Sequence, residues 1–412
     1  MRIASSDAGA GAAVTPPSRV AIRLGHAGQC FLRTRPGIER RMKSVAVFPR
    51  TRELRIIDEP EPVIQSPTQL LLRILDVGIC GTDREICAFE YGTPPQGAAH
   101  LVIGHESLAE VVAAGDAVET LRAGDLVIPM VRRPCTHDHC AACRAGRQDF
   151  CSTGDFRERG IKEAHGFMTE MVVEEERYLH RIPRTLRDVG VLVEPLTIAQ
   201  KALIQLWDIQ ERLPWTCPHR SGRRHGHCRR AVVLGAGPVG LLGAMALRAN
   251  DFETIVYSRD RAPHPKEELT RAIGASYVCS EDVAPADLAA HVGDIDVVYE
   301  AAGASAIAFE MMHALGANSV FVFTGVPGRR GPVQVDTDAL MRNLVLRNQV
   351  VFGTVNAGHD AFEAAVRELE GFVARWPQAV SSLISASHPL ENHRELLLGR
   401  PGGIKHVLRM AA

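Results

Sequence analysis

The sequence lacks a net charge and lacks long apolar runs. Its 47 basic residues nearly balance 48 acidic residues, and the formal charge of −1 argues against nucleic acid or an anionic membrane surface as a partner. No apolar run approaches the ~20 residues of a membrane-spanning helix. Ten cysteines in 412 residues are too few for a disulfide scaffold, so their clustering matters more than their number. This composition is typical of a soluble globular protein, and the length predicts two domains of roughly 150–200 residues.

Residues 1–41 differ in composition from the rest of the chain. They hold seven arginines against Asp7 and Glu39, and they are rich in Ala, Gly, Ser and Pro. They lack the continuous apolar stretch of about 7–15 residues that a secretory signal needs. We expect a disordered basic extension, or a mis-called start with Met42 as the true one. A targeting role is the less favoured interpretation.

Short apolar strands separated by turn residues dominate residues 42–200 and predict a β-rich domain. A helix is expected over 188–206, with a break at Pro195. From Ala231 onward, strands alternate with helical segments, a pattern that predicts a doubly wound parallel sheet. The expected strands are 44–48, 54–57, 69–75, 107–114, 126–131, 170–173, 231–234, 254–257, 276–279, 296–299, 319–323 and 349–352.

The linker 211–230 is rich in Arg, His, Pro and Gly. Its Cys and His residues suggest a metal site, but their spacing matches no common zinc pattern. A surface loop is therefore the favoured interpretation. The five residues concerned are Cys217, His219, His225, His227 and Cys228.

A glycine-rich loop follows the first strand of this second domain and begins a helix, which is the context of a dinucleotide-binding loop. Gly235 allows the tight turn, Gly237 allows the pyrophosphate to approach the backbone, and Gly240 allows the helix to pack on the strand. Pro238 and Val239 complete the motif.

The end of the next strand selects the cofactor. An acidic residue there binds the ribose 2′-hydroxyl of NAD, whereas arginine accepts the 2′-phosphate of NADP. Ser258 and Arg259 come first and Arg261 is nearby, which favours NADP. Asp260 leaves NAD possible as well.

Four cysteines lie within seventeen residues and suit a closed tetrahedral zinc site. Such free thiols imply a reducing compartment. His137 and His139 lie in the first gap and are competing ligands, but ligation by cysteine alone is favoured. The four ligands are Cys135, Cys140, Cys143 and Cys151.

A second, more dispersed set has the composition of a catalytic zinc site, which takes about three protein ligands and one open position. Cys80 supplies a thiolate and His105 an imidazole. Either Glu106 or Glu194 is the third ligand, and the residues alone leave this open. The sequence thus predicts two zinc ions per chain.

The chain resembles the zinc-dependent medium-chain dehydrogenase/reductase superfamily, because four motifs occur in that family's order. They are Cys80-Gly-Thr-Asp83, Gly104-His-Glu106, the four cysteines and Gly235–Gly240. The resemblance covers about 370 residues from Met42. Its details are most similar to the glucose 1-dehydrogenase branch, although the first gap between cysteines is four residues instead of the usual two. The segments that carry this closer similarity are 81–85, 146–151, 157–161, 165–168, 194–196 and 353–356.

The resemblance implies an α/β fold with two domains and an extension. Residues 42–200 are expected to form a GroES-like β-rich catalytic domain with a structural zinc lobe at 135–151. Residues 201–357 are expected to form the Rossmann domain, and 358–412 to return to the catalytic domain. It also implies homodimers or homotetramers paired through the edge of the nucleotide sheet, to which 320–323 is expected to contribute.

The family's site residues are expected at matching positions. The resemblance implies that Glu158 contacts a sugar, that Glu194 lies beside the zinc and the sugar, and that Asn356 lies near the nicotinamide and the sugar. Thr324 is a further expected cofactor contact.

The implied reaction oxidises an aldose, D-glucose or galactose, at C1 to a lactone. Zinc lowers the pKa of the anomeric hydroxyl, Thr82 relays the proton to Glu106 or water, and hydride passes to the nicotinamide. A cytoplasmic enzyme of carbohydrate metabolism is expected, without nucleic-acid or membrane partners. One alternative is an alcohol, polyol or threonine dehydrogenase. Another is a catalytically silent dinucleotide-binding protein, which the complete set of zinc ligands disfavours.

Overall fold

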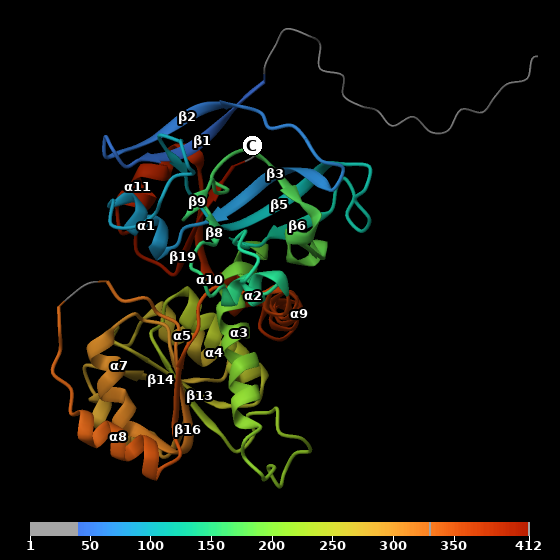
Figure 1. Ribbon diagram of the computed structural model, residues 1–412. Helices are drawn as coiled ribbons and strands as arrows, with labels where there is room; N and C mark the ends of the chain where they lie inside the picture. Colours follow the sequence, from blue (N-terminus) through green and yellow to red (C-terminus); the bar gives the residue numbers. More distant parts are fainter. Residues whose placement is uncertain (1–39, 329–330, 411–412) are drawn as a thin grey trace, which may run out of the picture. The chain divides into compact units, whose positions relative to one another are not determined.

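A computed structural model describes residues 40–328 and 331–410 of the chain (Figure 1). Most of the expected basic extension, including Cys30, lies outside the described residues. Arg41, at the end of that extension, belongs to strand β1 (Arg41–Phe48), where it pairs with Pro60 of β2 (Glu53–Pro60). The expected α/β class is confirmed by a β-rich part and a parallel sheet flanked by helices.

The β-rich part is built on a seven-stranded sheet, with the order β11-β6-β5-β3-β19-β18 and with β10 paired to β3. Strand β3 (Gln69–Gly78) completely buries Leu70, Leu72 and Ile74, because alternate side chains of a strand face the same side of the sheet. The strands are β3 (Gln69–Gly78), β5 (Glu106–Ala114), β6 (Leu126–Pro129), β10 (Met171–Glu175), β11 (Leu179–Ile182), β18 (Ile384–Pro389) and β19 (Lys405–Arg409).

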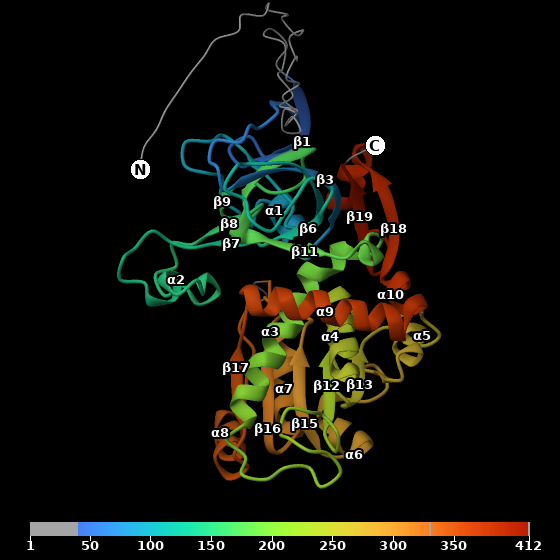
Figure 2. The ribbon, with the colours of Figure 1, turned by 90° about the vertical axis from the view of Figure 1, so that its right-hand side faces the viewer.

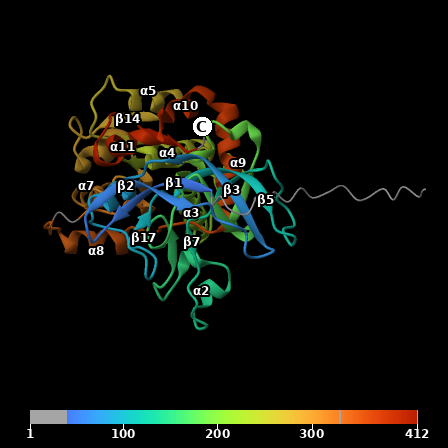
Figure 3. The ribbon, with the colours of Figure 1, turned by 90° about the horizontal axis from the view of Figure 1, so that it is seen from above.

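Two smaller sheets complete this part. Strands β2, β1 and β4 (Leu101–Val102) form one, and β7 (Arg132–Arg133), β8 (Arg157–Arg159) and β9 (Glu163–Ala164) form the other. Helix α1 (Gly81–Cys87) follows β3 directly. The segment with helix α2 (Ala141–Arg144) and the 3-10 helix Gln148–Phe150 projects from the body of the described chain (Figures 2 and 3).

The second sheet has six parallel strands in the order β14-β13-β12-β15-β16-β17. Helices α7 and α8 cover one face, and α3 and α4 cover the other (Figure 1). The strands are β12 (Arg230–Leu234), β13 (Glu253–Ser258), β14 (Ser276–Cys279), β15 (Ile295–Glu300), β16 (Leu315–Phe323) and β17 (Val350–Gly353). The helices are α3 (Val193–Gln210), α4 (Pro238–Ala249), α5 (Pro265–Ala272), α6 (Leu288–Val292), α7 (Ser305–Met311) and α8 (Thr337–Leu346).

The last part of the chain leaves the parallel sheet and joins the β-rich one. Helix α9 (His359–Arg375) is followed by α10 (Pro377–Leu383), β18, α11 (His393–Leu398) and β19. Strand β19 pairs antiparallel with β3, so residues from the C-terminal end lie beside residues that follow β3. In 40–328 and 331–410, no helix is long and apolar enough to cross a membrane.

Two expectations about these elements are wrong. Pro195 does not break a helix: it occupies the first turn of α3, where its missing N–H has no helical partner to lose. Residues 320–323 do not form the sheet edge, because β16 is paired on both sides and Val320 and Phe321 are fully buried. The edge strand is β17, whose residues are only partly buried.

Candidate active site

Three residues predicted as zinc ligands converge at the ends of β3 and β5. Cys80 precedes α1, His105 immediately precedes β5, and Glu106 is the first residue of β5. The antiparallel register places Gly78 opposite Glu106, which brings the two segments together. The Sγ of Cys80, a ring nitrogen of His105 and a carboxylate oxygen of Glu106 all lie within 4.8 Å of one another.

Asp83 fixes the orientation of this cluster. It is fully buried, its Oδ2 accepts the backbone N–H of Cys80 at 2.8 Å, and its Oδ1 lies 3.3 Å from Nδ1 of His105. Burial lowers the pKa of His105, but Asp83 and Cys80 raise it, and the net pKa lies well above the usual value. A carboxylate on Nδ1 directs Nε2 toward a metal ion. From the sequence, Asp83 was identified only as part of a motif, although its position three residues after an N-cap is a capping signal.

Lys405 is a site residue that sequence analysis missed. Its Nζ donates to Oε1 and Oε2 of Glu106 at 2.8 and 2.5 Å and to the carbonyl of Ile79 at 3.1 Å. Both charged side chains of this pair are almost completely buried. Burial lowers the pKa of Lys405, but Glu106, together with Cys80 and Glu194, raises it, and the net pKa is raised. No local pattern marks Lys405, because its partner is 299 residues away in the chain.

Glycine is required at position 78 by the same carboxylate. A Cβ there would lie 2.3 Å from Oε2 of Glu106, which is closer than real contacts allow. Gly78 therefore makes the space in which the buried Glu106–Lys405 pair lies.

Glu194 and Thr82 lie near the cluster without joining it. Glu194 is buried in the first turn of α3, and its carboxylate is outside the group of converging ligand atoms. Burial raises the pKa of Glu194 to about 7, opposed by His105 and reinforced by Glu106. The Oγ1 of Thr82 is 3.9 Å from the Sγ of Cys80.

The cluster fits a zinc ion. A thiolate, an imidazole and a carboxylate form a mixed donor set of the kind that holds zinc with one position open. Nδ1 of His105 and Oδ1 of Asp83, both buried, face each other, so Nε2 is the ring nitrogen left for a cation. Glu106 is the carboxylate that the structure places beside Cys80 and His105.

The glycine-rich loop faces the same cleft as Cys80 and Glu106. Gly235 has a φ of +101°, which disfavours other residues, and a Cβ at Gly240 would lie 2.0 Å from the carbonyl oxygen of Gly235. Gly237 caps α4 and has open space beside it, as a bound pyrophosphate would need. A cleft of about 630 Å³, open to solvent, is lined by Gly237, Pro238 and Val239 on one side and by Cys80, Glu106 and Lys405 on the other.

The end of β13 leaves one arginine free of an acidic partner. Asp260 is paired with Lys266 at 2.6 Å, and Arg261 lies 3.3 Å from Asp282. Arg259 is exposed, and within residues 40–328 and 331–410 no ion pair involves it. Ser258 is buried at the last position of the strand.

Glu300 organises the loops at the carboxyl ends of β15 and β16. Its buried carboxylate accepts the backbone N–H groups of Ala302, Gly303 and Gly325 at 2.8, 2.7 and 3.1 Å. Thr324 donates its hydroxyl to the Glu300 carbonyl at 2.7 Å. Thr324 was expected from the sequence, whereas Glu300 was not, because its role depends on loops that are brought together by the parallel sheet.

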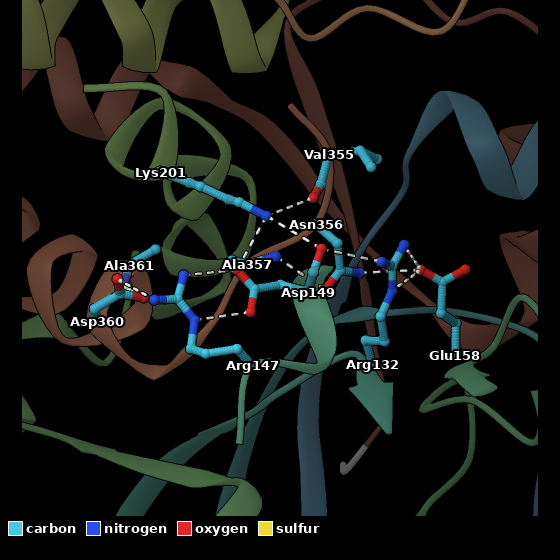
Figure 4. Close-up of polar contacts among 10 residues, drawn as sticks. All are labelled: Arg132, Arg147, Asp149, Glu158, Lys201, Val355, Asn356, Ala357, Asp360 and Ala361. Atoms are coloured by element: carbon cyan, nitrogen blue, oxygen red, sulfur yellow. Dashed lines mark hydrogen bonds and ion pairs between the residues drawn. The ribbon is translucent and has the colours of Figure 1, made fainter. Parts of the chain in front are cut away.

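Glu158 and Asn356, which are 198 residues apart, meet in the structure (Figure 4). Oε1 of Glu158 accepts Nε and Nη2 of Arg132 at 3.0 and 2.9 Å and Nδ2 of Asn356 at 3.0 Å. In the part of the chain that the structure describes, no hydrogen bond reaches Oε2. Asn356 has a left-handed backbone with a φ of 58°. Its Oδ1 accepts the backbone N–H of Ala357, which orients the side-chain amide so that Nδ2 donates to Glu158.

A buried carboxylate beside this pair ties the cysteine-rich segment to two other segments (Figure 4). Asp149 accepts two hydrogen bonds from Arg147 at 3.0 and 2.9 Å and pairs with Lys201 of α3 at 3.0 Å. Lys201 also donates to the carbonyl of Val355 at 3.0 Å, and Arg147 lies 3.4 Å from Asp360. Asp149 thus positions Lys201, which holds the loop that carries Asn356 next to Val355.

The four cysteines of the projecting segment converge as a second candidate metal centre. Their sulfur atoms lie within 4.8 Å of one another. His137 is not part of this group, and its Nε2 lies 2.5 Å from Asp155. Backbone N–H groups of Cys143 and Ser152 lower the pKa of Cys140, which favours a thiolate. Four sulfur ligands in one cluster fit a structural zinc ion.

Comparisons with known proteins agree with this architecture. Residues 66–184 match the family model of the alcohol dehydrogenase GroES-like domain, and residues 187–410 match that of the glucose dehydrogenase C-terminus. The chain is 36% identical over 372 residues to glucose 1-dehydrogenase of Methanocella arvoryzae, covering 90% of this chain and 100% of that protein. It is 36% identical over 375 residues to the enzyme of that name from Thermoproteus tenax, covering 90% and 99%.

A solved structure of Haloferax mediterranei glucose dehydrogenase, in complex with NADP, Zn and gluconolactone, shares the fold. Its TM-score is 0.80 and its sequence identity 31%, over 90% of this chain and 100% of that chain. Both family models and these relatives cover the two parts of the structure that form the cleft. The chain therefore belongs to the glucose dehydrogenase family, with an alcohol dehydrogenase GroES-like domain at its N-terminal side.

Proposed function

We propose that this chain oxidises an aldose at C1 to the lactone and transfers the hydride to NADP, and also to NAD. D-glucose is the first candidate substrate and galactose the second. One observation carries the proposal: a single cleft is lined by Cys80 and Glu106 of the zinc-type ligand set and by the dinucleotide-binding loop. The relatives named glucose 1-dehydrogenase and the neighbour holding gluconolactone support the choice of substrate.

Cys80, His105 and Glu106 are the residues that would hold the catalytic zinc, with Glu194 as the alternative carboxylate. Zinc supplies Lewis acidity, which lowers the pKa of a hydroxyl close to it. Lys405 holds the carboxylate of Glu106 in place by hydrogen bonding, and Asp83 keeps the imidazole of His105 turned toward the ligand group. Thr82, beside Cys80, is suited to relay a proton from the substrate hydroxyl toward water.

Glu158 is the proposed acceptor for sugar hydroxyls. Arg132 and Asn356 hold its Oε1, and this leaves Oε2 for the substrate. Because the carboxylate is already fixed by three hydrogen bonds, little conformational entropy is lost when a sugar binds. Glu194 is the second proposed acceptor.

Arg259 is the proposed partner of the 2′-phosphate of NADP. Asp260, which would repel that phosphate, is neutralised by Lys266, and Arg261 already faces Asp282. Replacing Arg259 with alanine removes one charge-assisted contact, so we expect a roughly 10- to 100-fold higher KM for NADP and an unchanged KM for NAD. Arg261→Ala is the matched control and should change the KM for NADP less. Equal effects of both substitutions on both coenzymes would contradict this assignment.

The experiment that tests the activity measures steady-state rates for glucose, galactose, xylose, simple alcohols, polyols and threonine, each with NAD and NADP. The highest kcat/KM is expected for an aldose, and chelation of zinc should abolish it. A higher kcat/KM for alcohols, polyols or threonine would replace the proposed substrate class. Binding of NADP without turnover of any substrate would overturn the enzymatic proposal.

We also propose that the protein is a cytoplasmic homodimer or homotetramer that acts in carbohydrate metabolism. Nine cysteines are free among the described residues, which suits a reducing compartment. Strand β17 is an edge strand, and the neighbouring helix α8 exposes Met341, Val345 and Leu346. An open edge beside exposed apolar side chains is suited to pairing with a second copy.

A further inference from the structure

The loop between α3 and β12 brings three soft metal ligands together. In Figure 2 this yellow-green loop runs along the lower end of the drawing, below the parallel sheet. The Sγ of Cys217 lies 3.6 Å from Nδ1 of His227 and 3.1 Å from the Sγ of Cys228. Nδ1 of His227 and the Sγ of Cys228 are also 3.1 Å apart. We propose that Cys217, His227 and Cys228 form a third zinc site, separate from the two described above.

The backbone explains why two consecutive residues face the same point. Neighbouring side chains of an extended chain point in opposite directions, so His227 and Cys228 would normally diverge. Here Arg229 donates its N–H to the carbonyl of Gly226 at 2.8 Å, and Cys228 has a φ of 67°. This left-handed conformation is unfavourable for residues other than glycine. The turn places both side chains next to Cys217, which is ten residues away from His227.

The turn is anchored to the body of the domain. Gly226 donates its N–H to the carbonyl of Asn250 at 2.7 Å, and a Cβ at position 226 would lie 2.2 Å from the ring of Phe252. Elsewhere in the loop, Arg224 pairs with Asp208 at 2.5 Å and Arg220 pairs with Asp251 at 3.0 Å. The ligands therefore lie on a loop that is held at several points.

The ligand atoms suit zinc in chemistry and nearly in spacing. Zinc binds thiolate at ~2.3 Å and imidazole at ~2.0 Å in a tetrahedron, which separates ligand atoms by roughly 3.4–3.8 Å. The observed separations of 3.1–3.6 Å require only a small outward shift of the side chains. His219 is the candidate for the fourth position, because its ring centre is 5.6 Å from that of His227.

The position of the loop makes this a structural site. It precedes Arg230, the first residue of β12, whereas the dinucleotide loop begins after Leu234 at the other end of that strand. The cleft lies at the carboxyl ends of parallel strands, so this zinc does not face the substrate. A metal bound to Cys217 and Cys228 would close the loop and protect two thiols that are otherwise partly exposed.

The test measures zinc per chain by elemental analysis of the purified full-length protein after equilibration with zinc and removal of loosely bound metal. The Cys217→Ser/Cys228→Ser double variant should hold one zinc fewer than the wild type. It should also melt at a lower temperature while keeping the wild-type kcat/KM for its sugar. His225→Ala is the matched control on the same loop, because His225 bonds to the carbonyl of Gly222 and should leave the zinc content unchanged.

The difference of one zinc does not depend on how many ions the other clusters hold, so failure here is distinguishable from failure of the proposed function. His219→Ala should weaken zinc retention without abolishing it. Equal zinc content in the wild type and the double variant would overturn the proposal. A Cys217–Cys228 disulfide found by peptide mapping of the unreduced, zinc-equilibrated protein would overturn it as well.

Discussion

At the scale of single residues, the site depends on buried charges whose partners come from distant parts of the chain. Glu106 is paired with Lys405, and Asp149 with Lys201 and Arg147. Removing one member of a buried pair leaves the other charge desolvated and without compensation, which costs more than the pair contributes. These residues are therefore sensitive to substitution even where they touch no ligand.

Glu158→Gln tests the proposed sugar contact. Glutamine keeps the shape of the side chain but loses the charge that a sugar hydroxyl would contact, so we expect kcat/KM for the aldose to fall roughly 10- to 100-fold. The KM for NADP and the zinc content should not change. The control is Glu174→Gln, which alters a buried carboxylate paired with Arg133 and Arg159. An equal fall in kcat/KM for the aldose in both variants would contradict a specific role for Glu158.

His180 predicts a pH dependence of stability. Its ring stacks on Phe362 at 5.0 Å and faces the ring of His359, and burial followed by His359 lowers the pKa of His180 to about 4. The unfolded chain, with an ordinary pKa near ~6.5, takes up a proton first as the pH falls. Stability is therefore lost between about pH 6.5 and pH 4, by about 2 kcal/mol at pH 5.

Urea unfolding of the wild type and of His180→Leu at pH 7.5 and pH 5 measures this effect. The variant should lose about 2 kcal/mol less than the wild type over this interval, because leucine does not titrate. His291→Leu, a substitution of an exposed histidine on α6, serves as the control. An identical pH dependence in all three proteins would refute the role of His180.

At the scale of elements, β19 connects the C-terminal end of the chain to the candidate active site. It pairs with β3 and carries Lys405 to Glu106. Lys405→Met should destabilise the zinc-free protein by about 3–5 kcal/mol, because Glu106 is left buried without a partner. Zinc should reduce that loss, since the ion supplies a positive charge beside the same carboxylate.

Urea midpoints with and without zinc measure the effect of Lys405→Met. Arg409→Met is the control, because Arg409 is an exposed residue at the end of the same strand. Similar losses for both variants would show that Lys405 contributes only through the packing of the strand.

The cysteine-rich segment is the second element whose position affects the site. Asp149 follows helix α2 of this segment and pairs with Lys201 of α3. Lys201 in turn donates to the carbonyl of Val355. A structural zinc in this segment would therefore keep Asn356 in place beside Glu158.

At the scale of the whole molecule, we predict a subunit interface on the face formed by β17 and α8. Met341, Val345 and Leu346 are 64%, 69% and 70% exposed, an unfavourable arrangement for apolar side chains that remain in water. Val345→Glu/Leu346→Glu should reduce the molar mass measured by light scattering to that of one chain.

A matched control for this interface is Val63→Glu. Val63 is 68% exposed but lies between β2 and β3, away from the parallel sheet. The Val63→Glu variant should therefore keep the molar mass of the wild type. If the double variant also keeps that mass, the interface lies elsewhere.

The sequence by itself determined the features that depend on near neighbours in the chain. The turn at Gly235–Gly240 and the four cysteines within residues 135–151 each lie within one short segment, so their chemistry is visible as spacing. The alternation of strands and helices determined the α/β class in the same way, because side-chain periodicity is a local property.

Only the tertiary structure decided what depends on convergence of distant segments. Lys405 reaches Glu106 because β19 pairs with β3, and Asn356 reaches Glu158 because of the loop held by Lys201. The grouping of Cys217 with His227 and Cys228 depends on one left-handed residue in a turn, which spacing does not reveal. The order of the strands is also visible only in the assembled sheet. Residues 320–323 have the apolar pattern of any buried strand, and only the pairing of β16 with both β15 and β17 shows that β17 is the edge strand.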